Sequence, residues 1–560
     1  MDFNSFNMKE QSTLTPEGFA VVVKGPASPP APNVQNAGHI VEDTSQDPFE
    51  LMNRFLKSLG GRDNILAASN EMIVSSGRRW HPGWGPTPDT AELVSIFSST
   101  LLAETSEPKY NLTMEDDTIA MMAVKLKYTE IGNGMTGSLE GADLLFNPRI
   151  VKSSIDAPRV LARNRHIDLL SPLRLASKLL YNRANSSVSI DMDADGSRKK
   201  VLTLTEPGRS PLHIFLNAAT GLPDKLVTTE DDPPFGDAVV EVIYDDYRKI
   251  QGCTLPYHVV IKLNGMIIHD ESRSIVQLGV AVTESPYQIQ VPALPAGPED
   301  PEKDRYAIYS TEWLMSYVYA GVSFYFDLQK APVRTEPVKI SEGVYIILGP
   351  SHNMLVVEME DHVVTVDAPL YGDYTSSALR QIKKAFPDKP LRAIVGTHFH
   401  YDHIGGMREL AAEGNVTVYV GLPTVHFFER IFKSPHTIRP DRFQQHPVEV
   451  DISPVISHLS LPALNGWQLE LYRIPNDHAD DMLIAYHTGA KIVFNSDLWN
   501  PTAVMPPPNS GRGRLATQLY DAITNLGLDV ESIVGGHSGF EGKNNIYIAP
   551  LSFLKTAAGR

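Results

Sequence analysis

Short apolar runs and a helical pattern alternate along the C-terminal part of the chain. Between residues 375 and 386 the apolar side chains recur at helical spacing, and Pro390 ends the pattern, which predicts a helix. The apolar runs are too short for helices and are bounded by glycine, proline and acidic residues, as is typical of buried strands. These runs are 344–348, 354–359, 363–366 and 391–395. Strands that alternate with helices predict a mixed α and β domain here.

The N-terminal half has a different pattern, in which short strand-like runs follow one another with only turns between them. Asn264-Gly265 is one of these turns, and five or six such runs in a row predict an antiparallel meander. The runs are 200–205, 212–216, 225–229, 238–244, 257–263 and 266–269. Two helical patterns precede them, at 49–59 and 162–180. The second has basic residues on one side, which we interpret as a solvated helix face, the alternative being contact with a membrane surface or an acidic partner.

Length and local composition divide the chain further. A chain of 560 residues exceeds the usual limit for one hydrophobic core, so two or three domains are expected. The first 48 residues are polar and rich in proline, which is typical of disorder, and proline and charge concentrate again after residue 290. We therefore predict the class α+β, with four parts in order. They are a disordered segment 1–48, an N-terminal α+β domain 49–290 with a curved antiparallel sheet, a linker and inter-domain segment 291–336, and a C-terminal domain 337–560.

Charge and cysteine content disfavour some classes of protein. The chain has 49 Lys and Arg against 66 Asp and Glu, and its net charge of −17 disfavours binding to nucleic acids. Its single cysteine excludes an intrachain disulfide, which agrees with a reducing, cytoplasmic location. The sequence has neither a secretory signal pattern nor an apolar run long enough for a membrane span. We therefore expect a small-molecule substrate, and the oligomeric state stays open.

Three imidazoles and one carboxylate fall within six positions, directly after the last of the predicted strands named above. They belong to the segment Thr-His-Phe-His-Tyr-Asp-His-Ile-Gly-Gly at 397–406. In a turn after a strand, His398 and His400 can point the same way, while Asp402 and His403 face a second point nearby. Neutral imidazole and carboxylate suit zinc, with manganese and iron as competitors. The segment therefore predicts a metal site at the edge of a sheet.

This segment resembles the HxHxDH signature of the metallo-β-lactamase superfamily, and four further motifs occur in the order of that family. Each is an Asp or His after a short apolar run, and each alone is a weak signal, whereas five in order are a strong one. The four residues are Asp367, His478, Asp497 and His537. The resemblance implies an αββα sandwich for residues 337–560.

The resemblance also implies roles for these side chains. It divides them into two groups of metal ligands, with one carboxylate between the groups and another that supports the ligand loop without binding metal. The implied assignment is His398, His400 and His478 for the first ion, Asp402, His403 and His537 for the second, Asp497 between them, and Asp367 as the supporting carboxylate.

Two divalent ions about 3.5 to 4 Å apart can share a water, lower its pKa and present hydroxide to an electrophilic carbonyl or phosphorus. Asp402 can also orient that water and accept its proton, which makes it the expected catalytic residue. We therefore predict a metallo-hydrolase with two Zn²⁺ per chain, or Mn²⁺ or Fe, that cleaves an ester, thioester or lactone bond of a small organic substrate. The true β-lactamases with a cysteine at the bridging position are disfavoured, because Asp497 stands there and Cys253 lies far upstream.

Two other functions fit parts of the pattern. The same ligands can hold two irons in a redox enzyme, although such relatives need a flavin module and the chain has no flavin fingerprint. The N-terminal meander resembles the curved half-barrel sheets of lipoprotein-carrier-like domains, by its pattern and by its Thr220-Gly-Leu-Pro and Gly252-Cys-Thr-Leu-Pro segments. A non-enzymatic carrier of a hydrophobic ligand is therefore the other alternative. Tyr371, Tyr401 and Trp499 are candidates for the pocket rim, and the identity of the substrate stays open.

Overall fold

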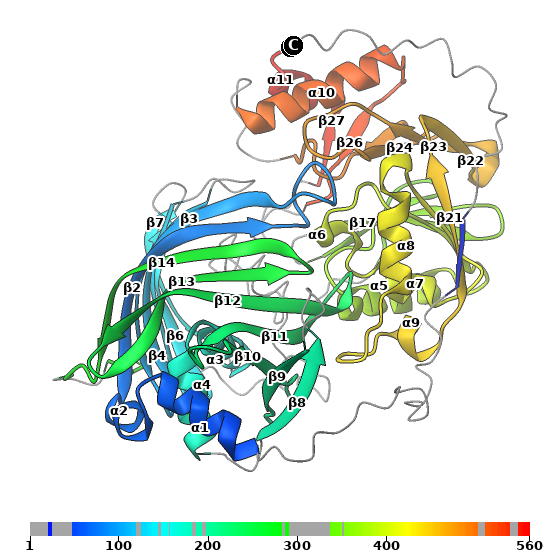
Figure 1. Cartoon of the computed structure of the whole chain (residues 1–560). Coiled ribbons are helices and arrows are strands. Elements are labelled where there is room, and N and C mark those ends of the chain that lie inside the picture. Colours follow the sequence, from blue (N-terminus) through cyan, green and yellow to red (C-terminus); the bar gives the residue numbers. More distant parts are fainter. Residues whose placement is uncertain are drawn as a thin grey trace, which may run out of the picture.

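The computed structural model describes residues 21–24, 48–118, 125–143, 147–155, 157–181, 186–192, 198–282, 286–289, 336–349, 352–501, 510–537 and 547–560. The strands form one sheet of thirteen strands in the N-terminal half and two sheets, of eight and six strands, in the C-terminal half (Figure 1). The class is α+β, as the sequence predicts. Within the described ranges, no helix combines the length and the apolar character that a membrane span needs.

The N-terminal half forms a curved antiparallel sheet that bends around two helices (Figure 1). The spatial order of its strands is β7-β6-β5-β4-β3-β2-β14-β13-β12-β11-β10-β9-β8. Their bounds are β2 Asn70–His81, β3 Glu92–Glu104, β4 Lys109–Thr118, β5 Lys125–Asn133, β6 Thr136–Asp143, β7 Asn147–Ile155, β8 Ser186–Met192, β9 Arg198–Leu204, β10 Leu212–Leu216, β11 Pro223–Asp232, β12 Gly236–Ile250, β13 Cys253–Leu263 and β14 Met266–Leu278. The six predicted strands are confirmed as β9 to β14. The meander is longer than predicted, because β2 to β8 belong to the same sheet.

The helices of the N-terminal half are α1 Pro48–Ser58, α2 Arg62–Ala67, α3 Ala157–Leu170 and α4 Pro172–Tyr181. The helix predicted at 49–59 is confirmed as α1. The pattern at 162–180 forms two helices, and the expectation of a solvated basic face is wrong. Arg163, Arg165 and Arg174 are at most 2% exposed, because α3 and α4 lie inside the curve of the sheet (Figure 1).

Each of these buried arginines has a carboxylate partner. The shortest N to O distances are 3.0 Å from Arg163 to Glu130, 2.9 Å from Arg165 to Glu230 and 2.8 Å from Arg174 to Asp168. Burial alone would raise the pKa of Glu130, but Arg163 and a second arginine on α3 lower it to about 2. The polar side of α3 and α4 is therefore the charged interior of the N-terminal domain.

The C-terminal half consists of two sheets packed face to face, with helices on the outer faces (Figure 1). The spatial orders are β1-β21-β20-β19-β18-β17-β16-β15 and β22-β23-β24-β25-β26-β27. Leu355 and Val395 of the first sheet share one buried core with Leu469 and Phe494 of the second. This arrangement confirms the αββα sandwich and the predicted helix, which is α5.

The bounds of the strands in this half are β15 Val338–Ser341, β16 Val344–Leu348, β17 Asn353–Glu358, β18 Val363–Val366, β19 Leu391–Val395, β20 Thr417–Gly421, β21 Glu449–Val455, β22 His458–Pro462, β23 Gln468–Arg473, β24 Leu483–His487, β25 Ile492–Phe494, β26 Ser532–Val534 and β27 Ile548–Pro550. The bounds of the helices are α5 Gly372–Ala385, α6 Tyr401–Ile404, α7 Met407–Ala411, α8 Val425–Lys433, α9 Arg442–Gln445, α10 Gly511–Asn525 and α11 Leu551–Ala557. All four predicted strands of this half are confirmed, as β16 to β19.

One strand of the eight-stranded sheet comes from the N-terminal segment of the chain. Val21–Lys24 form β1, which pairs antiparallel with β21 and places Val21 opposite Ile452. This strand lies within the segment 1–48 for which the sequence predicts disorder, and the rest of that segment, except for Pro48, lies outside the described residues. The pairing covers the free edge of β21 in the eight-stranded sheet. The predicted linker 291–336 lies outside the described residues except for Glu336.

The hairpin of β11 and β12 contacts the C-terminal half beside α8. The backbone N–H of Asp237 donates to the carbonyl oxygen of Pro435 at 2.8 Å. The carboxylate of Asp237 accepts from the backbone N–H groups of Thr437 and Ile438 at 2.8 and 3.0 Å. These three hydrogen bonds therefore hold the β11–β12 hairpin of the N-terminal half against the segment that follows α8.

Asp231, on the same hairpin, makes the stability of the protein depend on pH. Burial raises its pKa to about 7, against the opposing effect of Arg439 at 3.8 Å. The folded-state pKa lies above the unfolded value, so ionisation of Asp231 costs stability increasingly as the pH rises toward 7. We expect Asp231→Asn to gain stability relative to wild type, on the order of 2 kcal/mol, between about pH 5 and pH 8. Urea unfolding at several pH values measures this difference, and a difference that stays constant with pH would contradict the prediction.

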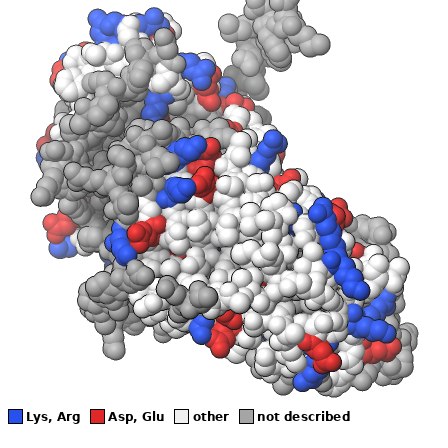
Figure 2. Space-filling model, turned by 90° about the vertical axis from the view of Figure 1, so that its left-hand side faces the viewer, with Lys and Arg blue, Asp and Glu red and all other residues white. Residues whose placement is uncertain are grey.

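Charged side chains on the surface are mixed in sign. On the face shown in Figure 2, Lys and Arg lie among Asp and Glu, with broad uncharged areas between them. Exposed ion pairs join Lys125 to Asp117 and Lys127 to Glu115 across β4 and β5. This face therefore has no continuous basic tract among the residues that the structure describes.

Candidate metal centre

The ligand loop follows β19, whose last residues are buried. His398 lies in the loop, and His400 immediately precedes the short helix α6. Asp367 lies directly after β18, has a φ of 67° and supports the ligand loop through its carboxylate. Its Oδ1 accepts from the backbone N–H of Thr397 at 3.0 Å, and its Oδ2 lies 3.0 Å from Nδ1 of His403. The Asp367 carboxylate therefore orients His403 so that the opposite ring nitrogen, Nε2, faces the site.

The structure brings together all seven residues implied as ligands. A first group, made of His398, His400, His478 and Asp497, has one ligand atom from each residue within 4.8 Å of the others. Nε2 of His478 lies 3.2 Å from Nε2 of His398 and 3.1 Å from Oδ2 of Asp497. The spacing fits one cation surrounded by three imidazoles and one carboxylate oxygen.

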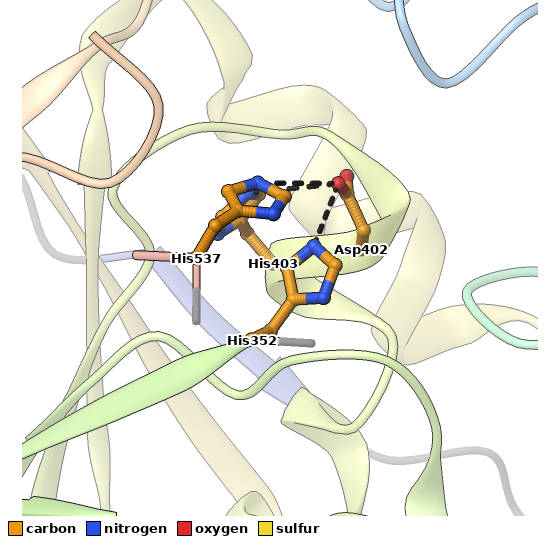
Figure 3. A group of neighbouring side chains, drawn as sticks. All are labelled: His352, Asp402, His403 and His537. Carbon is orange, nitrogen blue, oxygen red and sulfur yellow. Dashed lines mark hydrogen bonds and ion pairs between the residues drawn. The ribbon is translucent and has the colours of Figure 1, made fainter. Parts of the chain in front are cut away.

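The second group contains His352, Asp402, His403 and His537, again with one ligand atom each within 4.8 Å (Figure 3). Oδ2 of Asp402 lies 3.0 Å from Nε2 of His352, 3.7 Å from Nε2 of His403 and 3.9 Å from Nε2 of His537. Figure 3 shows the three rings directed at this carboxylate from separate segments of the chain. The arrangement fits a second cation beside the first.

Asp497 lies between the two groups, with one oxygen toward each. Its Oδ2 faces the first group, while its Oδ1 is 2.9 Å from Nε2 of His403 and 2.7 Å from Nε2 of His537. A carboxylate in this position can bind two cations at once, one through each oxygen. The Asp497 carboxylate therefore lies between the two groups, at the position for which the family resemblance implies a bridging ligand.

His352 is the residue that the sequence prediction missed. It immediately precedes β17 and forms an isolated antiparallel bridge with His537. The backbone N–H of Asn353 donates to the carbonyl oxygen of Gly536 at 2.6 Å, which fixes the two segments side by side. A histidine at the start of a predicted strand was the only signal in the sequence, and it lies outside the five family motifs.

Four buried ligand atoms lack a hydrogen-bond partner among the described residues. Unpartnered buried polar atoms are rare in folded proteins because each costs free energy, so a cluster of them indicates a bound group. They are Nδ1 of His400, Oδ1 of Asp402, and Nε2 of His403 with Oδ1 of Asp497, which lie 2.9 Å apart without the angles of a hydrogen bond. Nitrogen and oxygen ligands of this kind suit a divalent cation, so the residues present fit a pair of such ions.

The protonation of the site suits cation binding. Burial lowers the pKa of His398 well below its usual value, that of His400 to about 3 and that of His352 to about 4, so these rings are neutral at pH 7. Burial alone would raise the pKa of Asp402, but neighbouring histidines, His403 foremost, lower it well below its usual value. His403 differs from the other rings: burial alone would lower its pKa, but Asp497 and Asp402 raise it well above its usual value. Neutral imidazoles beside ionised carboxylates are the forms that bind metal ions, so His403 has to release a proton when a cation binds.

Two of the aromatic residues expected at the pocket rim are buried, while the third candidate, Tyr371, is half-buried. Tyr401 is 1% exposed and contacts His81 and Phe235 of the N-terminal half, with ring centroids 5.6 and 6.0 Å away. Trp499 is 4% exposed. Low exposure therefore gives these two side chains little surface to offer to a substrate.

Residues 341–526 match the family model of the metallo-beta-lactamase superfamily. An alkyl/aryl-sulfatase of Saccharomyces cerevisiae is 29% identical over 79 residues, and a linear primary-alkylsulfatase of Pseudomonas sp. is 32% identical over 79 residues. Each alignment covers 14% of this chain and 12% of the relative, so the chain matches only a small part of these proteins. The DIM-1 metallo-beta-lactamase structure is 18% identical, with 41% of this chain and 97% of that chain covered and a TM-score of 0.32. Residues 341–526 therefore form a domain that matches the metallo-beta-lactamase superfamily, and the two ligand groups, which also include His537 beyond the matched range, could hold metal ions.

Proposed function

We propose that the protein hydrolyses an ester, thioester or lactone bond of a small organic substrate, with two divalent cations, zinc by preference, in the two ligand groups. The observation that carries the proposal is the position of Asp497, whose two oxygens face the two groups separately. A pair of cations so held lowers the pKa of a shared water and stabilises the negative charge that develops on the substrate.

Asp402 supplies the general base in this proposal. Its Oδ2 faces His352, whereas its buried Oδ1 has no hydrogen-bond partner among the described residues. That oxygen can accept the proton of the attacking water, and the low pKa of the carboxyl keeps it ionised at neutral pH. Asp367 takes no direct part in the chemistry in this proposal. It keeps His403 in position through the contact of its carboxylate with Nδ1 of that ring.

Sulfate esters are a second candidate substrate class. The two curated relatives named above carry the names of alkylsulfatases, and the alignments connect them to this chain at 29% and 32% identity. A sulfate ester also presents a polarised ester group to an activated water. A substrate panel separates this class from the carboxylic esters, thioesters and lactones.

The test uses the full chain, purified without added metal and assayed before and after dialysis against a chelator. We expect about two zinc ions per chain, loss of turnover on chelation, and recovery with Zn²⁺ or Mn²⁺. The panel contains an aryl ester, an acyl thioester, a lactone and a primary alkyl sulfate. Full activity after chelation would overturn the hydrolytic proposal, and stoichiometric iron with visible colour would favour the di-iron redox alternative. Ligand binding by the N-terminal sheet with no turnover and no bound metal would favour the carrier.

Replacement of His352 tests the composition of the second group. We expect His352→Ala to weaken binding of the second cation roughly 10- to 100-fold, because one ring nitrogen and the hydrogen bond to Asp402 are lost. Metal analysis after equilibration with a competing chelator measures the effect. His426→Ala is the control, since that side chain is exposed on α8, away from both groups. If His352→Ala bound both cations as tightly as the wild type does, His352 would not be a metal ligand.

A further inference from the structure

The loop between β2 and β3 extends from the N-terminal sheet to the metal centre. The carbonyl oxygen of Gly85 in this loop lies 2.8 Å from Nε2 of His400. A carbonyl oxygen only accepts hydrogen bonds, so Nε2 carries the ring proton and donates it. The other ring nitrogen, Nδ1, then holds the lone pair, and it is the buried atom without a partner noted above. One contact from a distant part of the chain therefore selects the tautomer of a metal ligand.

The next residue of the loop makes a similar contact. The carbonyl oxygen of Pro86 accepts from the backbone N–H of Asp480 at 2.9 Å. Asp480 follows His478 by two residues, in the segment that supplies the third imidazole of the first group. Two consecutive carbonyl groups of the N-terminal domain therefore hold both histidine loops of that group, around His400 and around His478.

The loop is held in place by close packing. A Cβ atom on Gly83 would lie 2.4 Å from the ring of Tyr401, so only glycine lets the loop approach the ligand helix this closely. Trp84 stacks on His81 with ring centroids 4.5 Å apart, and His81 is fully buried against Tyr401. Prolines at positions 82, 86 and 88 restrict the backbone further. These contacts therefore fix the position of the two carbonyl groups beside the first ligand group.

We propose that the N-terminal domain is a positioning part of the metal centre: through the carbonyl group of Gly85, it holds His400 with Nδ1 toward the first cation. This rests on the proposed function, since it requires cations in the two groups. In this proposal the C-terminal domain alone does not form the complete metal centre. The first ligand group reaches its final geometry only when the β2–β3 loop contacts it.

Gly83→Val in the full chain tests the proposal, because the added side chain pushes the loop away from Tyr401 without changing any ligand. We expect affinity for the first cation to fall roughly 10- to 100-fold, as found when partners of metal-bound histidines are removed. The Co²⁺-loaded protein is expected to show an altered visible spectrum, which reports ligand geometry directly. Affinity is measured by competition with a chromophoric chelator.

The control is Thr87→Val in the same loop, an isosteric change whose hydroxyl pairs with Thr90 inside the loop. It is expected to leave affinity and spectrum unchanged. Melting of the metal-free proteins checks folding, and Gly83→Ala, which adds a single carbon atom, replaces the valine variant if that variant does not fold.

The outcomes separate this proposal from the proposed function. Wild-type affinity and an unchanged Co²⁺ spectrum in a folded Gly83 variant would overturn the role of the loop and leave the hydrolase proposal intact. Wild-type protein that binds no divalent cation would instead remove the proposed function, and this inference with it.

Discussion

Asp402→Ala is expected to reduce kcat roughly 10²- to 10⁴-fold, the range found for loss of a general base. In the proposed function, the side chain offers Oδ2 to the second ligand group and leaves Oδ1, which has no hydrogen-bond partner among the described residues, to accept the proton of the attacking water. Its removal takes away a cation ligand and the proton acceptor together, so loss of activity and loss of the second cation should occur in parallel. Steady-state kinetics on the best substrate of the panel, with metal analysis of the same sample, measure both.

Asp477→Ala is the matched control for this variant. Asp477 immediately precedes the ligand His478, but its side chain is exposed and belongs to neither ligand group. We expect unchanged kcat and metal content. A folded Asp402→Ala protein with wild-type turnover would exclude Asp402 from the chemistry.

Glu130→Ala is expected to destabilise the N-terminal domain by about 3 to 5 kcal/mol. Glu130 is fully buried and accepts hydrogen bonds from Arg163 at 3.0 and 3.2 Å, from Arg159 at 3.0 Å and from the hydroxyl of Tyr110 at 2.9 Å. Without it, the buried guanidinium of Arg163 loses the carboxylate that accepts two of its hydrogen bonds. Chemical denaturation followed by circular dichroism measures the free energy of unfolding.

Two comparisons show whether the lost counter-charge is the cause. Glu115→Ala, on the neighbouring strand, removes one member of an exposed pair with Lys127 and is expected to have little effect. A double variant with Leu at 130 and Met at 163 removes both buried charges, and we expect it to be more stable than Glu130→Ala. A double variant as unstable as the single one would indicate that lost packing, rather than an unpaired charge, causes the destabilisation.

Much of the fold follows from local sequence signals. Strands β9 to β14 and β16 to β19 are predictable because alternation of apolar and polar residues and the turns between them are local properties. The surroundings of α3 and α4, by contrast, depend on residues that are far away in the sequence. An amphipathic pattern shows which side of a helix is polar, but Arg163 and Arg165 find their carboxylates on β5 and β11, and only the curvature of the sheet brings these together. The pattern therefore predicted the helical region correctly and its surroundings wrongly.

In the metal centre, too, some residues are predictable from local sequence and others depend on the tertiary fold. The seven implied ligands lie in motifs whose spacing and strand context are visible in the sequence. His352 enters the site through its bridge to His537, which depends on how two distant segments meet. The contact of Gly85 with His400 could not be predicted for a different reason. It is made by a backbone carbonyl group, which every residue type has.

The pairing of β1 with β21 has a consequence for how this protein forms during synthesis. Val21–Lys24 are synthesised long before Glu449–Val455, so β1 cannot pair until β21 has emerged from the ribosome. Until then, β1 and the outer edge of β20 have unpaired backbone groups that a neighbouring nascent chain can bind. Slow synthesis or folding of β21 would therefore promote aggregation at this edge.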